Sequence, residues 1–458
     1  MVIKILLLVV FFAGMVAVGI SARRHAVSVS GFVLGGRSVG PWLTAFAYGT
    51  SYFSAVVFVG YAGQFGWKYG LASTWIGLGN AAIGSLLAWV VLGRRTRIMT
   101  QHLGSSTMPD FFEKRFDSKP LKITASVIIF IFLIPYTASI YNGLSRLFEM
   151  AFNIPYAVCV VVMAAFTAVY VILGGYMATA ISDFIQGIIM LFGIVVVVAA
   201  VLSGQGGFMN AVYELAQLPS DAAPTLGQPG AFTAFFGPDP VNLLGVVILT
   251  SLGTWGLPQM IQKFYAIRNE KAVRTGTVIS TVFAVIVSGG CYFLGGFSRL
   301  FDDPAIYGAD GAVVYDSIIP FMLSKLPDIL IGIVVVLVLS ASMSTLSSLV
   351  LTSSSTLTLD LIKGNLWKNM REESQIRTMR VLIAVFVAVS VLLAINPPDF
   401  IAQLMGISWG ALAGAFLAPF LYGIYWKRVT RAAVWASFAC GVGLTVGNLF
   451  FHFIDSAI

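Results

Sequence analysis

The chain has 458 residues, of which 58% are hydrophobic and 10% are charged, and its mean hydropathy is +0.91. A soluble domain carries about 25% charged residues, so this composition excludes a solvated globule and predicts an all-α membrane protein with many spans. The net charge of +8 follows from the topology described below, and no nucleic acid is expected as a partner.

Apolar runs of about 17–25 residues predict transmembrane helices. The first run follows a single Lys and ends at Arg23 without a small-residue cleavage site, so we expect a retained helix and not a cleaved signal peptide. About 12 spans are predicted in chain order, at 3–21, 42–64, 72–93, 123–148, 155–174, 179–203, 241–265, 274–298, 328–358, 379–396, 399–424 and 431–453.

Basic residues are distributed unevenly between the loops on the two sides of these spans. All but five of the 27 Lys and Arg residues fall in one set of alternate loops. Because cytoplasmic loops are rich in Lys and Arg, we expect this set inside the cell and both termini outside, in the plasma (inner) membrane. Segments 204–240 and 299–327 are then outer loops. The five exceptions are Lys4, Lys68, Arg146, Arg299 and Lys325.

Two of the spans are poor helices at their centres. Span 42–64 carries the sequence GTS at 49–51, and span 241–265 carries GTWGLP at 253–258. Glycine weakens a helix and proline removes a backbone donor, so both spans are predicted to be discontinuous. Carbonyls freed in this way are tolerated in a membrane where they face protein or a wet cavity, and there they can hold a cation.

The two interrupted spans are the second and the seventh, which is the offset expected for two five-helix repeats of inverted topology. We therefore predict an extra N-terminal helix with an inner loop at 1–40 and a first repeat at 41–204. An outer loop at 205–240, a second repeat at 241–424 and a C-terminal helix at 425–458 follow.

Asp183, in the sequence ISDFIQG, is the carboxylate that we place inside a span, with uncharged neighbours and no Lys or Arg within one turn. An acid in the membrane is a candidate functional residue because it is costly to bury without a partner. A carboxylate near the interface and reached by water is the alternative, and the sequence does not choose between the two.

The segment 340–358, SASMSTLSSLVLTSSSTLT, is dense in hydroxyl side chains within a membrane span. Such hydroxyls often bond to the carbonyl four residues earlier and pack closely against neighbours. They are also hard, neutral oxygen ligands of the kind that sodium requires. If this helix lies against the broken span 42–64, the sequence predicts a sodium site between them. At 100° per residue, the shared face holds Ala341, Ser344, Thr345, Ser348 and Thr352.

Several motifs occur in a familiar order along the chain: GFVLGGRSVGPWLTAFAYGTSYFSA (31–55), PYTASIYNGLSRLFE (135–149), VILGGYMATAISDFIQGIIM (171–190), GLPQMIQKFYA (256–266) and SMSTLSS (342–348). With them, the chain resembles the sodium/solute symporter family over nearly its whole length. The resemblance implies a five-plus-five inverted-repeat fold of the LeuT type with discontinuous helices 2 and 7. It also implies sodium-driven uptake of a small organic solute by alternating access.

The resemblance also implies ion ligands, for either one or two sodium ions as the coupling ion. The first sodium site would use the carbonyls of Thr50, Phe53 and Ala341 and the hydroxyls of Ser344 and Thr345. A second site, present in some members, would use Asp183, Ser344, Ser347 and Ser348.

The family positions that line the solute site match uncharged residues here. The proline-carrying branch has an acid at the position of Tyr52 and aromatic residues at those of Thr250 and Thr254, which argues against proline. The polar cluster of a sugar carrier is also missing after Ser54. We expect an amino acid, a monocarboxylate or a pantothenate-like acid. The expected lining is Ser51, Tyr52, Ser54, Tyr136, Thr254 and Trp255.

Other functions remain as alternatives. A proton-coupled carrier of the same fold would use Asp183 as the protonating group, and a sugar or sialic-acid symporter would differ only in its solute. A channel would need a continuous polar pore, and a receptor would need a soluble output domain. No catalytic constellation is found, so an enzyme is not expected. A monomer among membrane lipids is the simplest expectation for the assembly.

Overall fold

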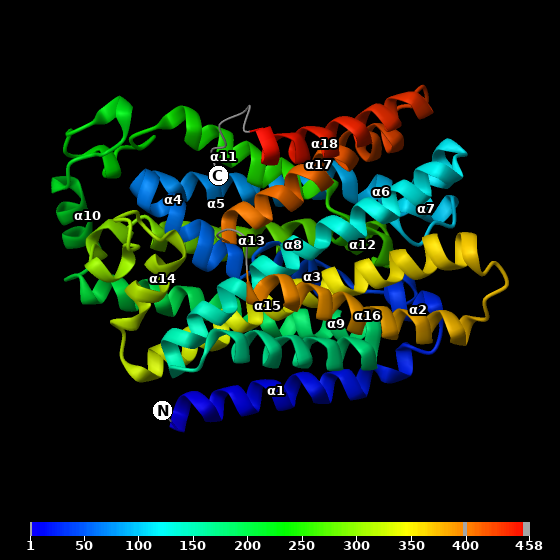
Figure 1. Cartoon of the computed structure of the whole chain (residues 1–458), viewed down its shortest axis with the longest axis horizontal. Helices are drawn as coiled ribbons and strands as arrows, with labels where there is room; N and C mark the ends of the chain where they lie inside the picture. Colours follow the sequence, from blue (N-terminus) through cyan, green and yellow to red (C-terminus); the bar gives the residue numbers. More distant parts are fainter. Residues whose placement is uncertain (1, 397–400, 452–458) are drawn as a thin grey trace.

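The structure is a computed structural model that describes residues 2–396 and 401–451, and these are mostly helical (Figure 1). Within these two ranges, strand pairing is limited to isolated β-bridges such as Val39 with Ile267. The first residues of the predicted span 399–424 lie outside the described residues. So do the last residues of span 431–453 and of the C-terminal segment 425–458.

Most of the main helices run roughly along a common axis in Figure 1. They are α1 (Val2–Ala22), α3 (Pro41–Tyr52), α8 (Lys119–Phe152), α9 (Tyr156–Gly204), α11 (Pro240–Leu252), α12 (Pro258–Ala266), α13 (Glu270–Gly295), α15 (Asp328–Thr356), α16 (Glu372–Ile395), α17 (Ile401–Tyr425) and α18 (Arg431–Phe451).

Shorter helices connect or extend these. They are α2 (Val29–Leu34), α4 (Ala62–Tyr69), α5 (Thr74–Gly79), α6 (Arg94–His102), α7 (Met108–Phe116), α10 (Phe208–Gln217) and α14 (Tyr315–Ser324). The π-helical stretches are Val56–Tyr61, Asn80–Leu87, Trp89–Gly93 and Leu357–Leu366. The 3₁₀ turns are Arg23–His25, Gly35–Arg37, Gly70–Ser73, Ala223–Thr225, Ala231–Thr233, Gly253–Gly256, Ser298–Phe301 and Pro304–Ile306.

Both predicted helix interruptions are present. Helix α3 ends at Tyr52, Phe53 is extended (φ −109°, ψ 93°), and helical structure resumes at Val56. Helix α11 passes through a 3₁₀ turn to the extended Leu257, and α12 begins at Pro258, whose ring nitrogen has no hydrogen to donate to the preceding turn. The two parts of this second broken helix meet at 52°. The prediction of discontinuous second and seventh spans is therefore confirmed.

Nine runs of the described residues are long and apolar enough to cross a membrane, or up to ten if the bent pair of α11 and α12 is one span. Two of the runs, Val56–His102 with 47 residues and Tyr156–Gly204 with 49, are far longer than the roughly 20 residues that one crossing needs. Glycines with positive φ interrupt both runs, Gly70 at 58° and Gly175 at 56°. Each long run can therefore hold parts of two predicted spans, and the count of about 12 stays a prediction.

The two predicted sets of loops lie at opposite ends of the molecule. Helices α10 and α14, from the predicted outer loops, lie at the left of Figure 1, and α2, α6 and α7, from the predicted inner loops, lie at the right. The start of α1 and the end of α18 lie toward the same end as α10 and α14. This arrangement agrees with an even number of crossings. Which end faces the cytoplasm stays a prediction.

Helix α15 lies in the core of the bundle. Of its most apolar window, 78% is buried, against 22% for α1 and 11% for α18, which lie along opposite edges of Figure 1. Helix α15 packs against α9, α8, α3 and α16. The hydroxyl-rich segment therefore lies inside the protein, away from lipid, where polar side chains can be satisfied.

We expect Gly175→Ala to lower the melting temperature of the purified protein. A Cβ at this residue would lie 2.8 Å from the carbonyl oxygen of Phe32, and the backbone (φ 56°, ψ −148°) is open essentially to glycine alone. We expect the free energy of unfolding to fall by about 1–3 kcal/mol or more. The matched control is Gly204→Ala, at the end of the same helix, where a Cβ would meet nothing within 4 Å. Equal melting temperatures of the two variants would contradict this account.

Candidate functional site

The contact between α3 and α15 centres on the carbonyl of Thr50. Because α3 stops at Tyr52, residue 54 is not placed to give this carbonyl its helical hydrogen bond. The hydroxyls of Ser344 and Thr345 on α15 lie within hydrogen-bond distance of it instead, at 3.1 and 3.2 Å, and each divides its single proton between this carbonyl and that of Ala341. The break in α3 thus exposes an oxygen atom, and the hydroxyl face of α15 satisfies it.

The same hydroxyls lie close to two further carbonyls. The Ala341 carbonyl is 3.0 Å from Ser344 Oγ and 3.1 Å from Thr345 Oγ1, and the Ser51 carbonyl is 3.5 Å from Thr345 Oγ1. Phe53 and Ala341 line a common cavity of about 10 Å³. That volume is near the lower limit for one water molecule. The residues predicted for the first sodium site therefore lie together.

The chemistry of this cluster fits a sodium ion. Backbone carbonyls and hydroxyls are neutral, hard oxygen ligands, and each hydroxyl can rotate to turn a lone pair toward a cation. The Thr50, Ser344 and Thr345 side chains are 0% exposed, and Ala341 is 2% exposed, so the cluster is closed to solvent. An ion that binds here would replace hydroxyl-to-carbonyl hydrogen bonds with ion-to-oxygen contacts.

The residues predicted for the second sodium site lie beside the first site, but a lysine lies among them. Lys263 Nζ on α12 donates to Ser348 Oγ at 2.8 Å and lies 3.8 Å from Asp183 Oδ2 on α9. Ser348 Oγ is also 2.8 Å from Ser51 Oγ. The Ser347 hydroxyl donates to the Ser344 carbonyl at 2.9 Å.

Asp183 therefore has a basic partner in space, although no Lys or Arg lies within one turn of it along the chain. Lys263 was assigned to an inner loop from its place at the end of an apolar run. Helix α12 begins at Pro258 and carries Lys263 into the core, where it is 1% exposed. The partner is distant along the chain, and the local sequence around Asp183 held no sign of it.

The residues predicted to line the solute site are buried, and most of their polar groups bind other parts of the protein. Tyr52 donates to the Thr250 carbonyl at 2.7 Å, and the indole of Trp255 donates to the Ile83 carbonyl at 3.1 Å. Ser54 Oγ accepts from the backbone of the resuming helix, at Val56 N, 3.2 Å away.

Two other predicted lining residues also have polar partners within the protein. The hydroxyl of Thr254 donates to the Ser251 carbonyl at 2.9 Å. Ser51 belongs to the ion region, since its hydroxyl meets Ser348. The polar groups of these residues already have partners within the protein, so these residues shape the predicted site and offer few free groups to a solute.

Tyr136 is the exception, and it leads to a residue that the sequence did not single out. Its ring meets the ring of Trp409 on α17 edge to face, with centroids 6.0 Å apart. Tyr136 is 0% exposed and Trp409 2%. Within the described residues, neither the Tyr136 hydroxyl nor the Trp409 indole nitrogen has a hydrogen-bond partner. The signal in the sequence was a tryptophan inside an apolar span, because a buried indole needs an acceptor.

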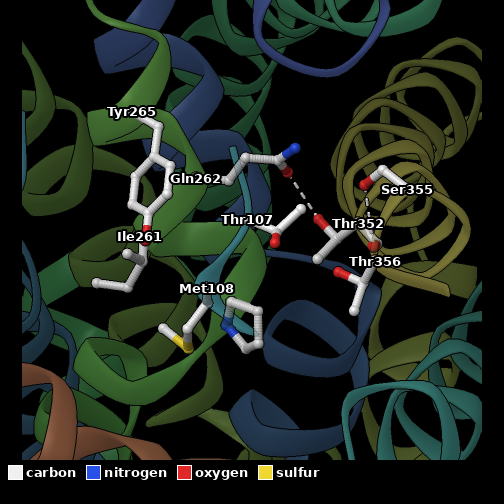
Figure 2. Close-up of a pocket in the computed structure, with 9 residues that line it drawn as sticks. Thr107, Met108, Ile261, Gln262, Tyr265, Thr352, Ser355 and Thr356 are labelled. Carbon is white, nitrogen blue, oxygen red and sulfur yellow. Dashed lines mark hydrogen bonds between the residues drawn. The ribbon is translucent and has the colours of Figure 1, made fainter. Parts of the chain in front are cut away.

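A second small cavity lies on the predicted cytoplasmic side of the ion residues. Figure 2 shows it between α12, α15 and the start of α7, with Gln262 and Thr352 pointing toward each other. Thr352 Oγ1 lies 2.7 Å from Gln262 Oε1. The cavity measures about 10 Å³, too small for an organic solute. The route past Thr352 is closed in this conformation.

A buried carboxylate that was not predicted lies near this cavity. Asp360 accepts from the hydroxyl of Thr107 at 2.6 Å and lies 3.6 Å from Lys122 Nζ. It is 1% exposed. These contacts join the end of the α15 segment to the segments that hold α7 and α8.

Comparison with known proteins identifies the family. The sequence model of the sodium:solute symporter family matches residues 32–441. The chain belongs to this family. Two similar relatives are the sodium/proline symporters of Escherichia coli (strain K12), 28% identical, and Staphylococcus aureus (strain JH9), 29% identical. The matches cover 95% of this chain in both cases and 86% and 84% of the relatives.

Solved structures share the fold of this symporter. One is a sodium-coupled sialic acid symporter in a substrate-bound, outward-open state, with a TM-score of 0.80 and 18% identity. That match covers 100% of this chain and 92% of the other. A nucleobase-cation-symport-1 family transporter in a closed conformation matches at a TM-score of 0.52 and 13% identity, over 93% and 96% of the two chains.

The predicted identity and fold are thus confirmed. The symporter is an integral membrane protein of the LeuT-type fold, sodium is its coupling ion, and it takes up a small organic solute with sodium. Its family and named relatives are transporters.

We expect Ser344→Ala to weaken sodium binding, because it removes one oxygen ligand beside the Thr50 carbonyl. A loss of about 1–2 kcal/mol would raise the sodium concentration for half-maximal thermal stabilisation by roughly 5- to 30-fold. Ser342→Ala is the matched control, because its hydroxyl is equally buried on the same helix but bonds back to the Val338 carbonyl at 2.7 Å. Similar sodium titrations for both variants would exclude Ser344 as a ligand.

Proposed function

We propose that the symporter imports a small carboxylic acid with a partly apolar body by alternating access, with sodium bound at the first predicted site. The candidate solutes are an amino acid, a monocarboxylate or a pantothenate-like acid. The observation that carries this proposal is the cluster of Thr50, Ala341, Ser344 and Thr345 oxygens at the break of α3, next to an uncharged aromatic site.

The proposed solute class follows from the chemistry of the lining. Tyr52, Tyr136 and Trp255 offer aromatic surface for an apolar body. None of the predicted lining residues is charged, so a carboxylate would be compensated by the sodium ion and by the N-terminal end of the half-helix α12. Proline and sialic acid, which appear in the names of the similar proteins, are both carboxylic acids.

Proline itself is included among the candidates as an amino acid. The sequence argued against it because Tyr52, Thr250 and Thr254 differ from the proline-carrying branch. In support of that argument, the Tyr52 hydroxyl is already bound to the Thr250 carbonyl. The similarity to sodium/proline symporters argues in the other direction, at 28–29% identity. A solute panel is therefore the appropriate test.

In the proposed cycle, sodium enters from outside and replaces the hydrogen bonds between α3 and α15, which holds the broken segment beside the solute site. The coupling is reciprocal, so solute binding raises sodium affinity by the factor by which sodium raises solute affinity. At a membrane potential of about 100 mV, each sodium ion contributes about 2.3 kcal/mol. This energy corresponds to more than one decade of solute accumulation, at about 1.4 kcal/mol per decade.

The proposal includes the placement of the protein. We place it in the plasma (inner) membrane with both termini outside, as a monomer that carries no enzymatic activity. The basic loops that hold α2, α6 and α7 would then face the cytoplasm and its anionic lipids.

The test is uptake into proteoliposomes with radiolabelled proline, other amino acids, monocarboxylates, pantothenate, sugars and sialic acid. Uptake of a small carboxylate that requires an inward sodium gradient is the expected result. Uptake driven by a pH gradient without sodium would favour the proton-coupled alternative. Transport of a neutral sugar alone would contradict the proposed solute class.

For the solute that is transported, we expect Tyr136→Phe to raise KM by roughly 2- to 30-fold while the melting temperature stays unchanged. One lost hydrogen bond to the solute is worth about 0.5–2 kcal/mol, and the Tyr136 hydroxyl has no partner among the described residues.

Tyr48→Phe is the matched control. The Tyr48 hydroxyl is equally buried but donates to the Gly84 carbonyl at 2.7 Å, so its loss should lower stability and leave KM unchanged. A destabilised Tyr136→Phe variant with an unchanged KM would show a structural role instead.

A further inference from the structure

We propose that the ammonium group of Lys263 is the permanent counter-charge of Asp183 and fills the second predicted ion site, so that this symporter couples one sodium ion to each solute. The inference rests on the proposed function, in which sodium binds between Thr50 and Ser344. It concerns a separate group of residues, so the two can fail independently.

The position of Lys263 carries the inference. Its ammonium group lies among the predicted ligands of the second ion, 2.8 Å from Ser348 Oγ and 3.8 Å from Asp183 Oδ2. The ammonium nitrogen also lies over the ring of Tyr176, 5.3 Å from its centroid. A carboxylate, a hydroxyl oxygen and an aromatic face are all groups that attract a cation. The site therefore already contains its cation, supplied by the protein.

Both members of the pair are buried away from water. Lys263 is 1% exposed and Asp183 is 0% exposed. Within the described residues, neither carboxylate oxygen of Asp183 accepts a hydrogen bond, so Lys263 is its main source of compensation. The pair is electrically neutral. A sodium ion added between them would place two positive charges against one carboxylate where water cannot screen their repulsion.

The other predicted ligands of the second ion have different partners. Ser344 Oγ lies with the Thr50 carbonyl at the first site, and the Ser347 hydroxyl donates to the Ser344 carbonyl. Ser348 Oγ accepts from Lys263 and lies within hydrogen-bond distance of Ser51 Oγ. Each of the three serine hydroxyls thus already has a partner within the protein.

Lys263 belongs to α12, the second half of a broken helix. Its ammonium group joins α12 to α9 through Asp183 and to α15 through Ser348, which also meets Ser51 in α3. A charge fixed to the protein replaces a transported ion in this position. The fixed charge stabilises the arrangement of these helices but draws no energy from the sodium gradient, which accounts for a ratio of one sodium per solute.

The test is the number of ²²Na⁺ ions bound per chain at saturation, measured on the purified protein without solute. We expect one ion for the wild type and two for Lys263→Met, which frees Asp183 and Ser348 while keeping an unbranched side chain of similar length. Lys263→Arg keeps the cation and should bind one ion. Adding Asp183→Asn to Lys263→Met should return the number to one.

Two results would overturn the inference: a wild type that binds two ions, or a folded Lys263→Met protein that still binds one. If Lys263→Met does not fold, Asp183→Asn in the wild type decides the question, because the number of ions stays at one if Asp183 serves Lys263 and falls if it serves sodium. A wild type that binds no sodium would instead contradict the proposed function.

Discussion

A backbone carbonyl without its helical partner is the constraint on which this structure depends. In a membrane such an oxygen must be satisfied by protein, water or an ion. The break after Tyr52 frees the Thr50 carbonyl, and the Ser344 and Thr345 hydroxyls meet it from a helix far along the chain. The placement of α15 in the core follows, because its hydroxyls need polar partners that lipid cannot offer. The same atoms can exchange a hydrogen bond for a sodium ion at little cost in desolvation, since they are already dry.

The second group of polar residues obeys a different rule. A buried carboxylate needs a positive charge, and removing one member of a buried pair typically costs about 3–5 kcal/mol. The positive charge beside Asp183 on α9 is the ammonium group of Lys263 on α12. Neutral oxygens and a charged pair thus lie side by side, joined through Ser348 and Ser51. The neutral cluster could bind and release a cation, whereas the cation of the charged pair is part of the Lys263 side chain and stays with the protein.

Much of the fold, and which residues meet at the first predicted ion site, could be predicted because the signals are local. Gly253 and Pro258 interrupt a helix whatever tertiary contacts surround it, and the 3.6-residue period fixes the helix face that holds Ser344 and Thr345. Lys263 and Trp409 were missed because their roles depend on contacts between distant segments. A lysine at the end of an apolar run looks the same whether it faces lipid headgroups or a buried aspartate. Which oxygens already have partners, as for Tyr52 and Ser54, also requires coordinates.

The closed site explains why movement and binding are linked. The ligands of the first predicted site are almost completely buried, and the neighbouring cavities hold about 10 Å³ each. For an ion to reach the Thr50 carbonyl, elements around it would have to move, and separation of α3 from α15 would break the hydrogen bonds that Ser344 and Thr345 make to it. Without sodium, these bonds hold the contact closed. A sodium ion at the first predicted site would replace these bonds and hold the same contact. A state in which α3 and α15 are apart would leave the Thr50 carbonyl to water, so either set of contacts would favour the closed arrangement.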